Sequence, residues 1–264
     1  MAVQLDVILD TLCLCVVATV AGAVNSVAGG GTLLTFPALI AVLGQDATAA
    51  VVANATSTVA LFPGSLAGMA GYRGELGQVH WWARRLFAPS LLGGLIGSLL
   101  LMRMPAESFK ALVPWLILAA ALLFWLQPRI ARWIGLGTIG ETSQPRHVGL
   151  VIVFQFGIAI YGGYFGAGIG ILMLAALALM GLHDIHEMNG LKTLLGSSIN
   201  GVAVVVFIAS GKVDWAFALA MAAAAILGGY GGARVARRLD RNFVRRVVVF
   251  IGFSLAGYYF YRAA

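Results

Sequence analysis

Long runs of hydrophobic residues, separated by short polar stretches, occupy most of the chain. They predict two sets of helices on either side of the polar stretch 128–147. The first set is 7–24, 32–43, 49–71, 86–102 and 109–127, and the second is 148–163, 169–180, 188–210, 214–233 and 244–262. A helix needs about 20 apolar residues to cross the hydrocarbon core of a bilayer. The pattern therefore predicts an all-α integral membrane protein.

A glycine-interrupted hydrophobic stretch occurs once in each set of helices. Gly31 and Gly168 lie within these stretches and are 137 positions apart. Further along, LeuGlyGly at 92–94 matches LeuGlyGly at 227–229. This repetition predicts two structural repeats, 1–127 and 148–264, joined by the linker 128–147. Each repeat would comprise a broken element followed by three transmembrane helices.

The broken element of the first repeat, residues 7–43, is about twice as long as one crossing needs. It is either a re-entrant hairpin that returns to its own side or one long kinked span. Arginines gather between 71 and 86, in the linker, and between 233 and 247, and such residues collect on the cytoplasmic side. We favour the hairpin because it brings all three groups to that side. The two repeats are then inverted relative to each other, the linker is cytoplasmic, and both termini lie outside.

Composition supports this class and excludes others. The chain is 61% hydrophobic and 10% charged, whereas a soluble domain carries roughly 25% charged residues. Its net charge of +7 comes mainly from loop arginines, without a basic run that contains interleaved aromatic residues, so we expect no nucleic-acid partner. No nucleophile–base pair or phosphate loop is recognisable, so we expect neither an enzyme nor a bound cofactor.

The two glycine runs are candidate substrate-binding segments. The short helix after each break begins with free N–H groups at the positive end of its dipole, which attracts anions, and glycine lets a ligand approach the backbone closely. The candidates are Asn25, Ser26, Gly29, Gly30, Gly31 and Thr32 in the first run, and Tyr164, Gly166, Gly168 and Gly170 in the second. The alternative use of glycine in a membrane helix is close packing against another helix. We consider this alternative also for the glycines outside the two runs, which are Gly22, Gly93, Gly97, Gly228 and Gly232.

A polar segment follows each break. Lys192 is the only lysine well within a hydrophobic segment. An ionisable residue there indicates a functional site, and snorkelling to the interface is the alternative. Asn189, Thr193, Ser197 and Asn200 fall on or near one helix face, with Asn54 and Ser57 as counterparts in the first repeat. We therefore add Asn54, Ser57, Asn189, Lys192, Thr193 and Ser197 to the candidate substrate site. Helix–helix hydrogen bonds are the alternative use of each hydroxyl.

Absent residue types limit the cargo. No Asp or Glu lies deep within a predicted span, although cation and proton carriers commonly use buried carboxylates. One lysine, two helix N-termini and neutral donors favour a small anion. His183 and His186 have no known zinc spacing, so we expect no metal site. The sequence leaves open whether a proton or sodium ion is coupled to transport and whether the protein is a homodimer.

At these residues the sequence resembles the sulfite exporter TauE/SafE family of membrane permeases. The resemblance is carried by AsnSerValAlaGlyGlyGlyThrLeuLeuThrPheProAla at 25–38, GlyGlyTyrPheGlyAlaGlyIleGly at 162–170, the region 192–200 and GlyLysValAspTrp at 211–215. It covers essentially the whole chain. It implies a duplicated transporter in the bacterial inner membrane that moves sulfite, an organosulfonate such as sulfoacetate, or a related sulfur oxyanion.

The residues and the resemblance together predict a multi-pass secondary transporter that exports a small sulfur-containing anion. The two halves would rock against each other to expose a shared site alternately. A passive anion channel with the same lining and a non-transporting membrane scaffold are the alternatives.

Overall fold

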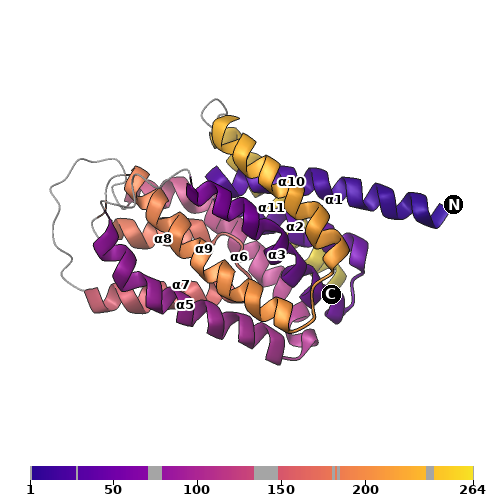
Figure 1. Ribbon diagram of the computed structural model, residues 1–264, viewed down its shortest axis with the longest axis horizontal. Helices are drawn as coiled ribbons and strands as arrows, with labels where there is room; N and C mark the ends of the chain where they lie inside the picture. Colours follow the sequence, from indigo (N-terminus) through magenta and orange to yellow (C-terminus); the bar gives the residue numbers. More distant parts are fainter. Residues whose placement is uncertain are drawn as a thin grey trace.

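The computed structural model describes residues 2–27, 29–70, 79–133, 148–179, 182, 185–235 and 241–263. These residues form ten helices and no strand, which confirms the predicted all-α class. The helices, shown in Figure 1, are α1 (Ala2–Val27), α2 (Thr32–Leu43), α3 (Ala47–Ala70), α5 (His80–Arg103), α6 (Ala106–Trp133), α7 (Val148–Tyr164), α8 (Ile169–Leu179), α9 (Ile185–Ala209), α10 (Trp215–Val235) and α11 (Arg241–Ala263).

Helix α6 runs further than the sequence predicts. It continues through Pro128 to Trp133, six residues past the predicted end at 127. The rest of the predicted linker, residues 134–147, lies outside the described residues.

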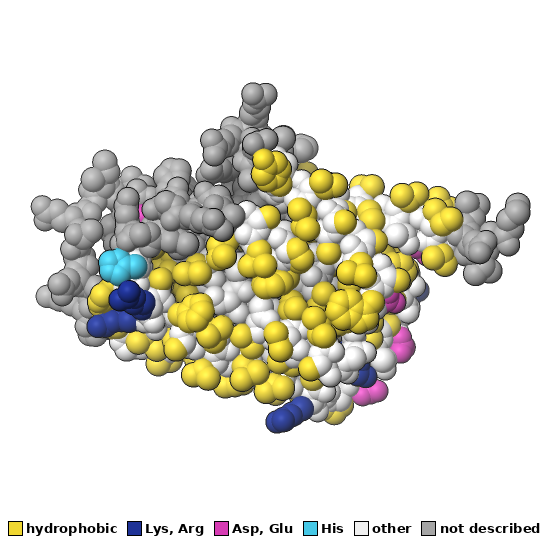
Figure 2. All heavy atoms as spheres, viewed as in Figure 1, with side chains coloured by type: hydrophobic (Ala, Val, Ile, Leu, Met, Phe, Trp, Pro, Cys, Tyr) yellow, Lys and Arg dark blue, Asp and Glu magenta, His cyan; other side chains and the backbone are white. Residues whose placement is uncertain are grey.

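Five of the described helices are long and apolar enough to cross a membrane: α1, α3, α5, α6 and α9. The 24 residues of α3 are about 36 Å long, against roughly 30 Å of hydrocarbon. Shorter apolar helices are α2, α7 and the Trp215–Gly231 part of α10. Figure 2 shows hydrophobic side chains across the visible face, with charged side chains gathered toward its two ends. This distribution suits a protein whose middle contacts lipid.

The most extensive helix contacts join the two halves of the chain. Helix α1 packs along α10, and α7 packs along α5; α3 then contacts α10, and α9 contacts α5. Glycines permit these approaches, because a Cβ on Gly93 would lie 2.7 Å from the Phe156 carbonyl oxygen, and one on Gly228 would overlap the Thr19 carbonyl oxygen. At these positions the close-packing interpretation is confirmed.

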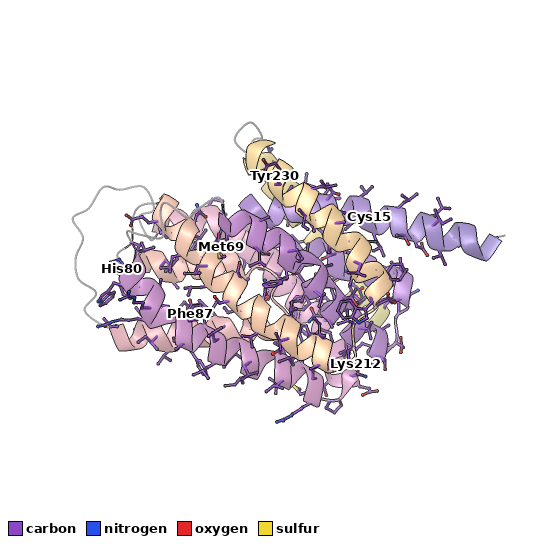
Figure 3. The ribbon with its side chains drawn as sticks, viewed as in Figure 1. Cys15, Met69, His80, Phe87, Lys212 and Tyr230 are labelled. Carbon is purple, nitrogen blue, oxygen red and sulfur yellow. The ribbon has the colours of Figure 1, made fainter. Side chains whose placement is uncertain are left out.

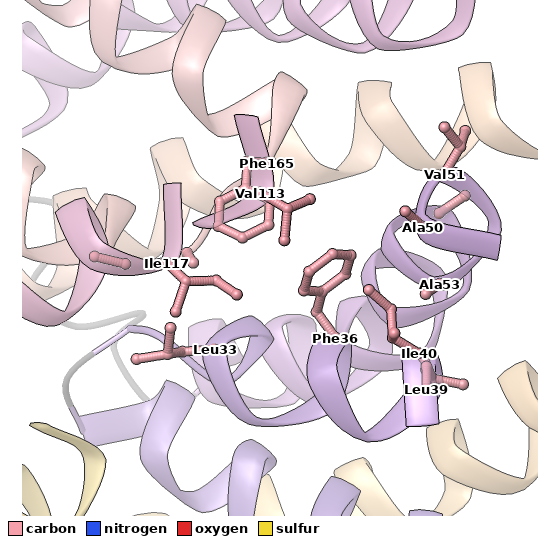
Figure 4. Close-up of a cluster of buried hydrophobic side chains, with 14 of the residues drawn as sticks. Leu33, Phe36, Leu39, Ile40, Ala50, Val51, Ala53, Val113, Ile117 and Phe165 are labelled. Carbon is pink, nitrogen blue, oxygen red and sulfur yellow. The ribbon is translucent and has the colours of Figure 1, made fainter. Parts of the chain in front are cut away.

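Helix α2 lies at the centre of the core, and its buried residues include Leu33, Phe36, Leu39 and Ile40. The Phe36 ring meets the Phe165 ring edge-on, with centroids 5.3 Å apart and planes at 87°. Figure 4 shows this cluster, in which Val113 and Ile117 of α6 face the same side chains. Phe165 directly follows α7, so the aromatic contact ties α2 to the second glycine break.

Both glycine runs interrupt the helices, at positions that match along the chain. Helix α1 ends at Val27 and α2 begins at Thr32, while α7 ends at Tyr164 and α8 begins at Ile169. The two starting residues are separated by 137 positions, the offset found in the sequence. The glycine runs are therefore true breaks and not parts of continuous rods.

The turns that end α1 and α7 have the same hydrogen-bond pattern. Gly29 has a φ of 69° and Gly166 a φ of 79°, a left-handed conformation that glycine adopts at little cost. The Gly29 N–H donates to the Val24 carbonyl at 3.3 Å, and the Gly166 N–H donates to the Tyr161 carbonyl at 3.2 Å. Each bond spans five residues, which is how a left-handed glycine closes a helix C-terminus.

Candidate functional site

A cavity of about 50 Å³ lies where the two glycine breaks meet. A Cβ on Gly29 would lie 3.0 Å from the Gly170 Cα, so the first break directly contacts the first turn of α8. Helices α1, α3 and α9 complete the walls. The lining residues are Asn25, Gly29, Gly64, Ser65, Ile169, Gly170, Met173, Lys192, Thr193, Gly196, Ser197 and Asn200.

Six of the predicted site residues are among these lining residues. They are Asn25, Gly29, Gly170, Lys192, Thr193 and Ser197. They come from both predicted repeats and are far apart in the sequence. Contact between the two breaks is what brings them together.

Lys192 places a positive charge in the cavity wall. It is 5% exposed, and its Nζ donates a hydrogen bond of 3.0 Å to Asn189 Oδ1, one turn earlier in α9. The candidate span of this helix begins at Glu187, so Lys192 lies about 7.5 Å inside it along the helix axis. Among the described lining residues, Lys192 is the one charged group. The ammonium is thus covered by protein, and it is the charged group that the described part of the chain contributes to the cavity wall.

Ser197, five residues further along α9, supplies a hydroxyl that has no hydrogen-bond partner. The side chain is 6% exposed, and its Oγ is buried and unpaired. Buried polar groups are normally hydrogen-bonded. Because Ser197 also lines the cavity, its hydroxyl is available to a molecule that occupies the space.

Asn25 and Ser65 form the opposite polar wall. The Asn25 Nδ2 donates to Ser65 Oγ at 2.8 Å, and the Ser65 hydroxyl donates to the Leu61 carbonyl at 3.1 Å. This short chain of hydrogen bonds holds α1 against α3 beside the first break. Asn25 is therefore fixed at the cavity by a partner from the next helix.

The two short helices that follow the glycine breaks, α2 and α8, differ in their position relative to the cavity. Ile169 and Gly170, in the first turn of α8, line it, whereas no residue of α2 does. A Cβ on Gly30 would overlap the Phe124 ring, and one on Gly31 would lie 2.6 Å from the Ala21 carbonyl oxygen. The expectation that both helix N-termini reach one space is met for α8 alone, because protein packs against the start of α2.

Other predicted site residues join helices elsewhere. Ser57 Oγ lies 2.6 Å from Thr35 Oγ1, which connects α3 to α2. The Asn54 Nδ2 donates to the Tyr164 carbonyl at 3.2 Å, which connects α3 to the end of α7. These contacts match the alternative interpretation, helix–helix hydrogen bonding.

The remaining predicted residues lie outside the cavity wall or outside the described side chains. Thr32 begins α2, while Gly166 and Gly168 form the second turn with φ values of 79° and 75°. Ser26 belongs to α1, but its side chain lies outside the described residues. The same holds for His183 and the side chain of His186. Among the described residues, no group of three or more His, Cys, Asp or Glu could hold a metal ion.

Several cavity residues were absent from the predicted site. They are Gly64, Ser65, Ile169, Met173, Gly196 and Asn200. Helix periodicity could have indicated Ser65, because it follows Ser57 by eight residues and so falls near the same face of α3. Asn200 belongs to the polar stripe of α9 that the spacing had already revealed.

The comparisons with known proteins indicate a membrane transporter. A family model described as "Sulfite exporter TauE/SafE" matches residues 14–259. The chain belongs to this family. Membership makes this TauE/SafE protein a membrane transporter and not an enzyme, and its apolar helices fit a multi-pass bacterial membrane protein.

Curated relatives of this TauE/SafE protein are also named as transporters. "Probable membrane transporter protein YfcA" of Escherichia coli (strain K12) is 28% identical over 238 residues, covering 89% of this chain and 84% of the relative. "Probable membrane transporter protein ORF9" of Sinorhizobium sp is 29% identical over 250 residues, covering 91% and 88%. A "Probable membrane transporter protein" of Haemophilus influenzae is 25% identical over 264 residues, covering 97% and 95%. No solved structure matches the chain.

Proposed function

We propose that this TauE/SafE protein is a secondary transporter that exports sulfite, an organosulfonate or a related small sulfur-containing anion across the bacterial inner membrane. The observation that carries the proposal is the cavity at the meeting of the two breaks, with a buried lysine and an unpaired hydroxyl in its wall. The name of the family model adds the choice of a sulfur oxyanion.

The size of the cavity favours a small substrate. Its volume is about 50 Å³, whereas a cavity that holds a single water needs roughly 10–15 Å³ on the same scale. The space therefore suits a compact group such as sulfite, which has one sulfur and three oxygens, or the sulfonate end of a longer molecule. A longer organic chain would require the walls to open.

The donors in the wall suit an oxyanion. Lys192, Thr193, Ser197 and Asn25 carry N–H or O–H groups, and Gly170 lies in the first turn of α8, at the positive end of the helix dipole. A hydrogen bond to a charged group contributes roughly 1.5–3 kcal/mol, about twice the value between neutral groups. Lys192 is thus the side chain from which we expect the largest contribution to anion binding.

The directions of the helices support inverted repeats with boundaries at 1–127 and 148–264. Figure 3 labels His80, where α5 begins, at one end of the molecule, and Lys212, after α9, at the other. Helix α3 leads toward His80 and α9 leads to Lys212, so these two matched helices run in opposite directions. Both chain termini lie toward the Lys212 end in Figure 1.

Contacts near the chain termini support the re-entrant hairpin. The Gln45 Nε2, just after α2, donates to Tyr258 Oη at 3.3 Å, close to the C-terminus. Helix α2 therefore returns toward the end of the molecule at which α1 begins. Rocking of two inverted halves around a cavity at their contact would expose the anion to each side in turn.

Transport by purified protein tests the proposal. In proteoliposomes loaded with sulfite, we expect radiolabelled sulfite to accumulate transiently by counterflow, because a carrier exchanges bound substrate across the membrane. Lys192→Ala should weaken the apparent affinity by roughly 10- to 100-fold, because a charge-assisted hydrogen bond is lost. A panel of sulfite, sulfonates, sulfate and carboxylates, run with and without proton or sodium gradients, identifies the anion and the coupling ion.

Lys212→Ala is the matched control, since Lys212 is an exposed lysine in the turn after α9 and should leave affinity unchanged. Equal sulfite affinity in wild type and Lys192→Ala would remove Lys192 from the site. Anion flux without counterflow would identify a passive channel instead, and no flux of any tested anion would contradict the proposal.

A further inference from the structure

A second cavity, of about 530 Å³, lies between α6 and α11 and is separate from the site of the breaks. Its lining combines two arginines, Arg129 and Arg246, with the hydrophobic side chains of Trp125, Val249, Phe250 and Phe253. The volume falls within the range of about 300–1,000 Å³ that small-molecule sites occupy. Nothing in the proposed transport mechanism uses it.

This cavity is an open groove between α6 and α11, with a positively charged part and a hydrophobic part. The Arg129 guanidinium lies 4.6 Å from the centroid of the Trp125 ring, an arrangement that orients the cation. The candidate span of α6 ends at Leu126, so Arg129 sits just past the hydrocarbon boundary. Trp125 and Phe250 are 48% and 73% exposed. The groove is thus cationic at headgroup level and apolar beside it.

We propose that the α6–α11 groove binds an anionic phospholipid of the cytoplasmic leaflet. Two guanidinium groups match a phosphate diester in charge and hydrogen-bond geometry, and the exposed rings of Trp125 and Phe250 match the acyl chains beneath it. Helix α11 ends at the C-terminus, so Arg246 near its start lies toward the opposite, arginine-rich end. Basic pockets between transmembrane helices on that side bind anionic headgroups.

Lipid titration of the purified full chain tests this assignment. In detergent, dioleoyl phosphatidylglycerol should raise Tm and remain bound in native mass spectra, whereas dioleoyl phosphatidylcholine should do neither. Arg129→Gln with Arg246→Gln should weaken phosphatidylglycerol binding by roughly 30-fold, because each arginine near an anionic lipid contributes about a 5-fold attraction. The pair Arg129→Lys with Arg246→Lys keeps the charge without the guanidinium geometry and should bind phosphatidylglycerol more tightly than the glutamine pair but less tightly than wild type, which separates loss of charge from misfolding.

Arg85→Gln is the matched control. Arg85 also stacks on a tryptophan, 3.9 Å from the Trp81 ring centroid, but it does not line the groove, so its loss should leave lipid binding unchanged. Equal phosphatidylglycerol affinity in wild type and the glutamine double variant would overturn the proposal. So would equal stabilisation by inorganic phosphate, which would indicate a soluble-anion site. Dissociation of a dimer by the double variant, with lipid binding unchanged, would assign the groove to a second copy of the chain.

Discussion

At the scale of single residues, the polar groups around the breaks fall into two kinds. Ser57 Oγ is bonded to Thr35 of α2 and the Asn54 Nδ2 to the Tyr164 carbonyl, so both residues hold α3 in place, although the Asn54 Oδ1 has no hydrogen-bond partner. Ser197 is buried but has an unpaired hydroxyl beside the cavity. An unsatisfied buried group costs free energy, and a bound anion would supply the missing acceptor.

Ser197→Ala should therefore affect binding more than stability. The substitution removes no hydrogen bond of the described structure, so we expect an unchanged Tm. Loss of one donor to the anion should weaken apparent affinity about 3- to 10-fold in proteoliposome uptake. Ser198→Ala is the control, because the Ser198 hydroxyl donates to the Leu194 carbonyl at 2.8 Å within its own helix. A lower Tm with unchanged affinity for Ser197→Ala would assign this hydroxyl a structural role.

At the scale of helices, glycine has two separate uses in this protein. In the breaks, Gly29 and Gly166 adopt positive φ and end α1 and α7. In the paired helices, Gly93 and Gly228 remain helical and let two backbones touch. Without a hydrophobic driving force between helices in lipid, such close packing contributes much of their association.

Gly228→Ala tests the second use. Its Cβ would overlap the Thr19 backbone, so α1 and α10 must separate, and we expect a loss of about 1–3 kcal/mol in stability, as for overpacked cores. Thermal unfolding in detergent measures this as a lower Tm. Gly231→Ala, in the same helix, has no neighbour within 4 Å and should leave Tm unchanged or raise it. Equal Tm values for the two variants would show that α10 shifts without cost.

At the scale of the whole molecule, the most extensive helix contacts join a helix of one half of the chain to a helix of the other half. The pair α1 and α10 corresponds to α7 and α5, and the pair α3 and α10 corresponds to α9 and α5. Each half thus packs its first helix against the fourth helix of the other half. Neither half can bury these faces alone, so movement of one half against the other must involve all of these contacts.

Cysteine accessibility tests the inverted arrangement and its orientation. In a background that lacks Cys13 and Cys15, Lys212→Cys should react with a membrane-impermeant maleimide on intact cells. Arg84→Cys should react only after permeabilisation, because arginine-rich ends remain cytoplasmic. Both residues are exposed, so access to the reagent depends on the side of the membrane. Labelling of both cysteines from the same side would contradict inverted repeats.

The sequence predicts the helices and their breaks well because both depend on local physical chemistry. Hydrophobic runs long enough to span a bilayer must form helices that satisfy their own peptide groups, and the predicted segments match α1 to α11 one for one. Likewise, GlyGlyGly at 29–31 and GlyAlaGlyIleGly at 166–170 lie where helices end and restart. The offset of 137 residues recurs in the hydrogen bonds that close α1 and α7.

The composition of the cavity could be predicted only in part. Asn189, Thr193, Ser197 and Asn200 fall on or near one helix face, which spacing reveals, but whether a break faces a cavity or a neighbour depends on contacts between distant segments. Phe124 fills the space beside Gly30, and no local pattern around either residue indicates this contact. The α6–α11 groove likewise requires Arg129 and Arg246 to line one space from helices that are far apart in the sequence.

By itself, then, the sequence determined an all-helical membrane protein with two helix breaks that lie 137 positions apart. Segment length, hydrophobicity and glycine conformation act within a few turns of the chain. Only the tertiary structure decided that the start of α8, and not that of α2, adjoins the cavity, and that Ser65 of α3 joins Lys192 of α9 around it. Those choices follow from how closely side chains of separate helices fill the space between them.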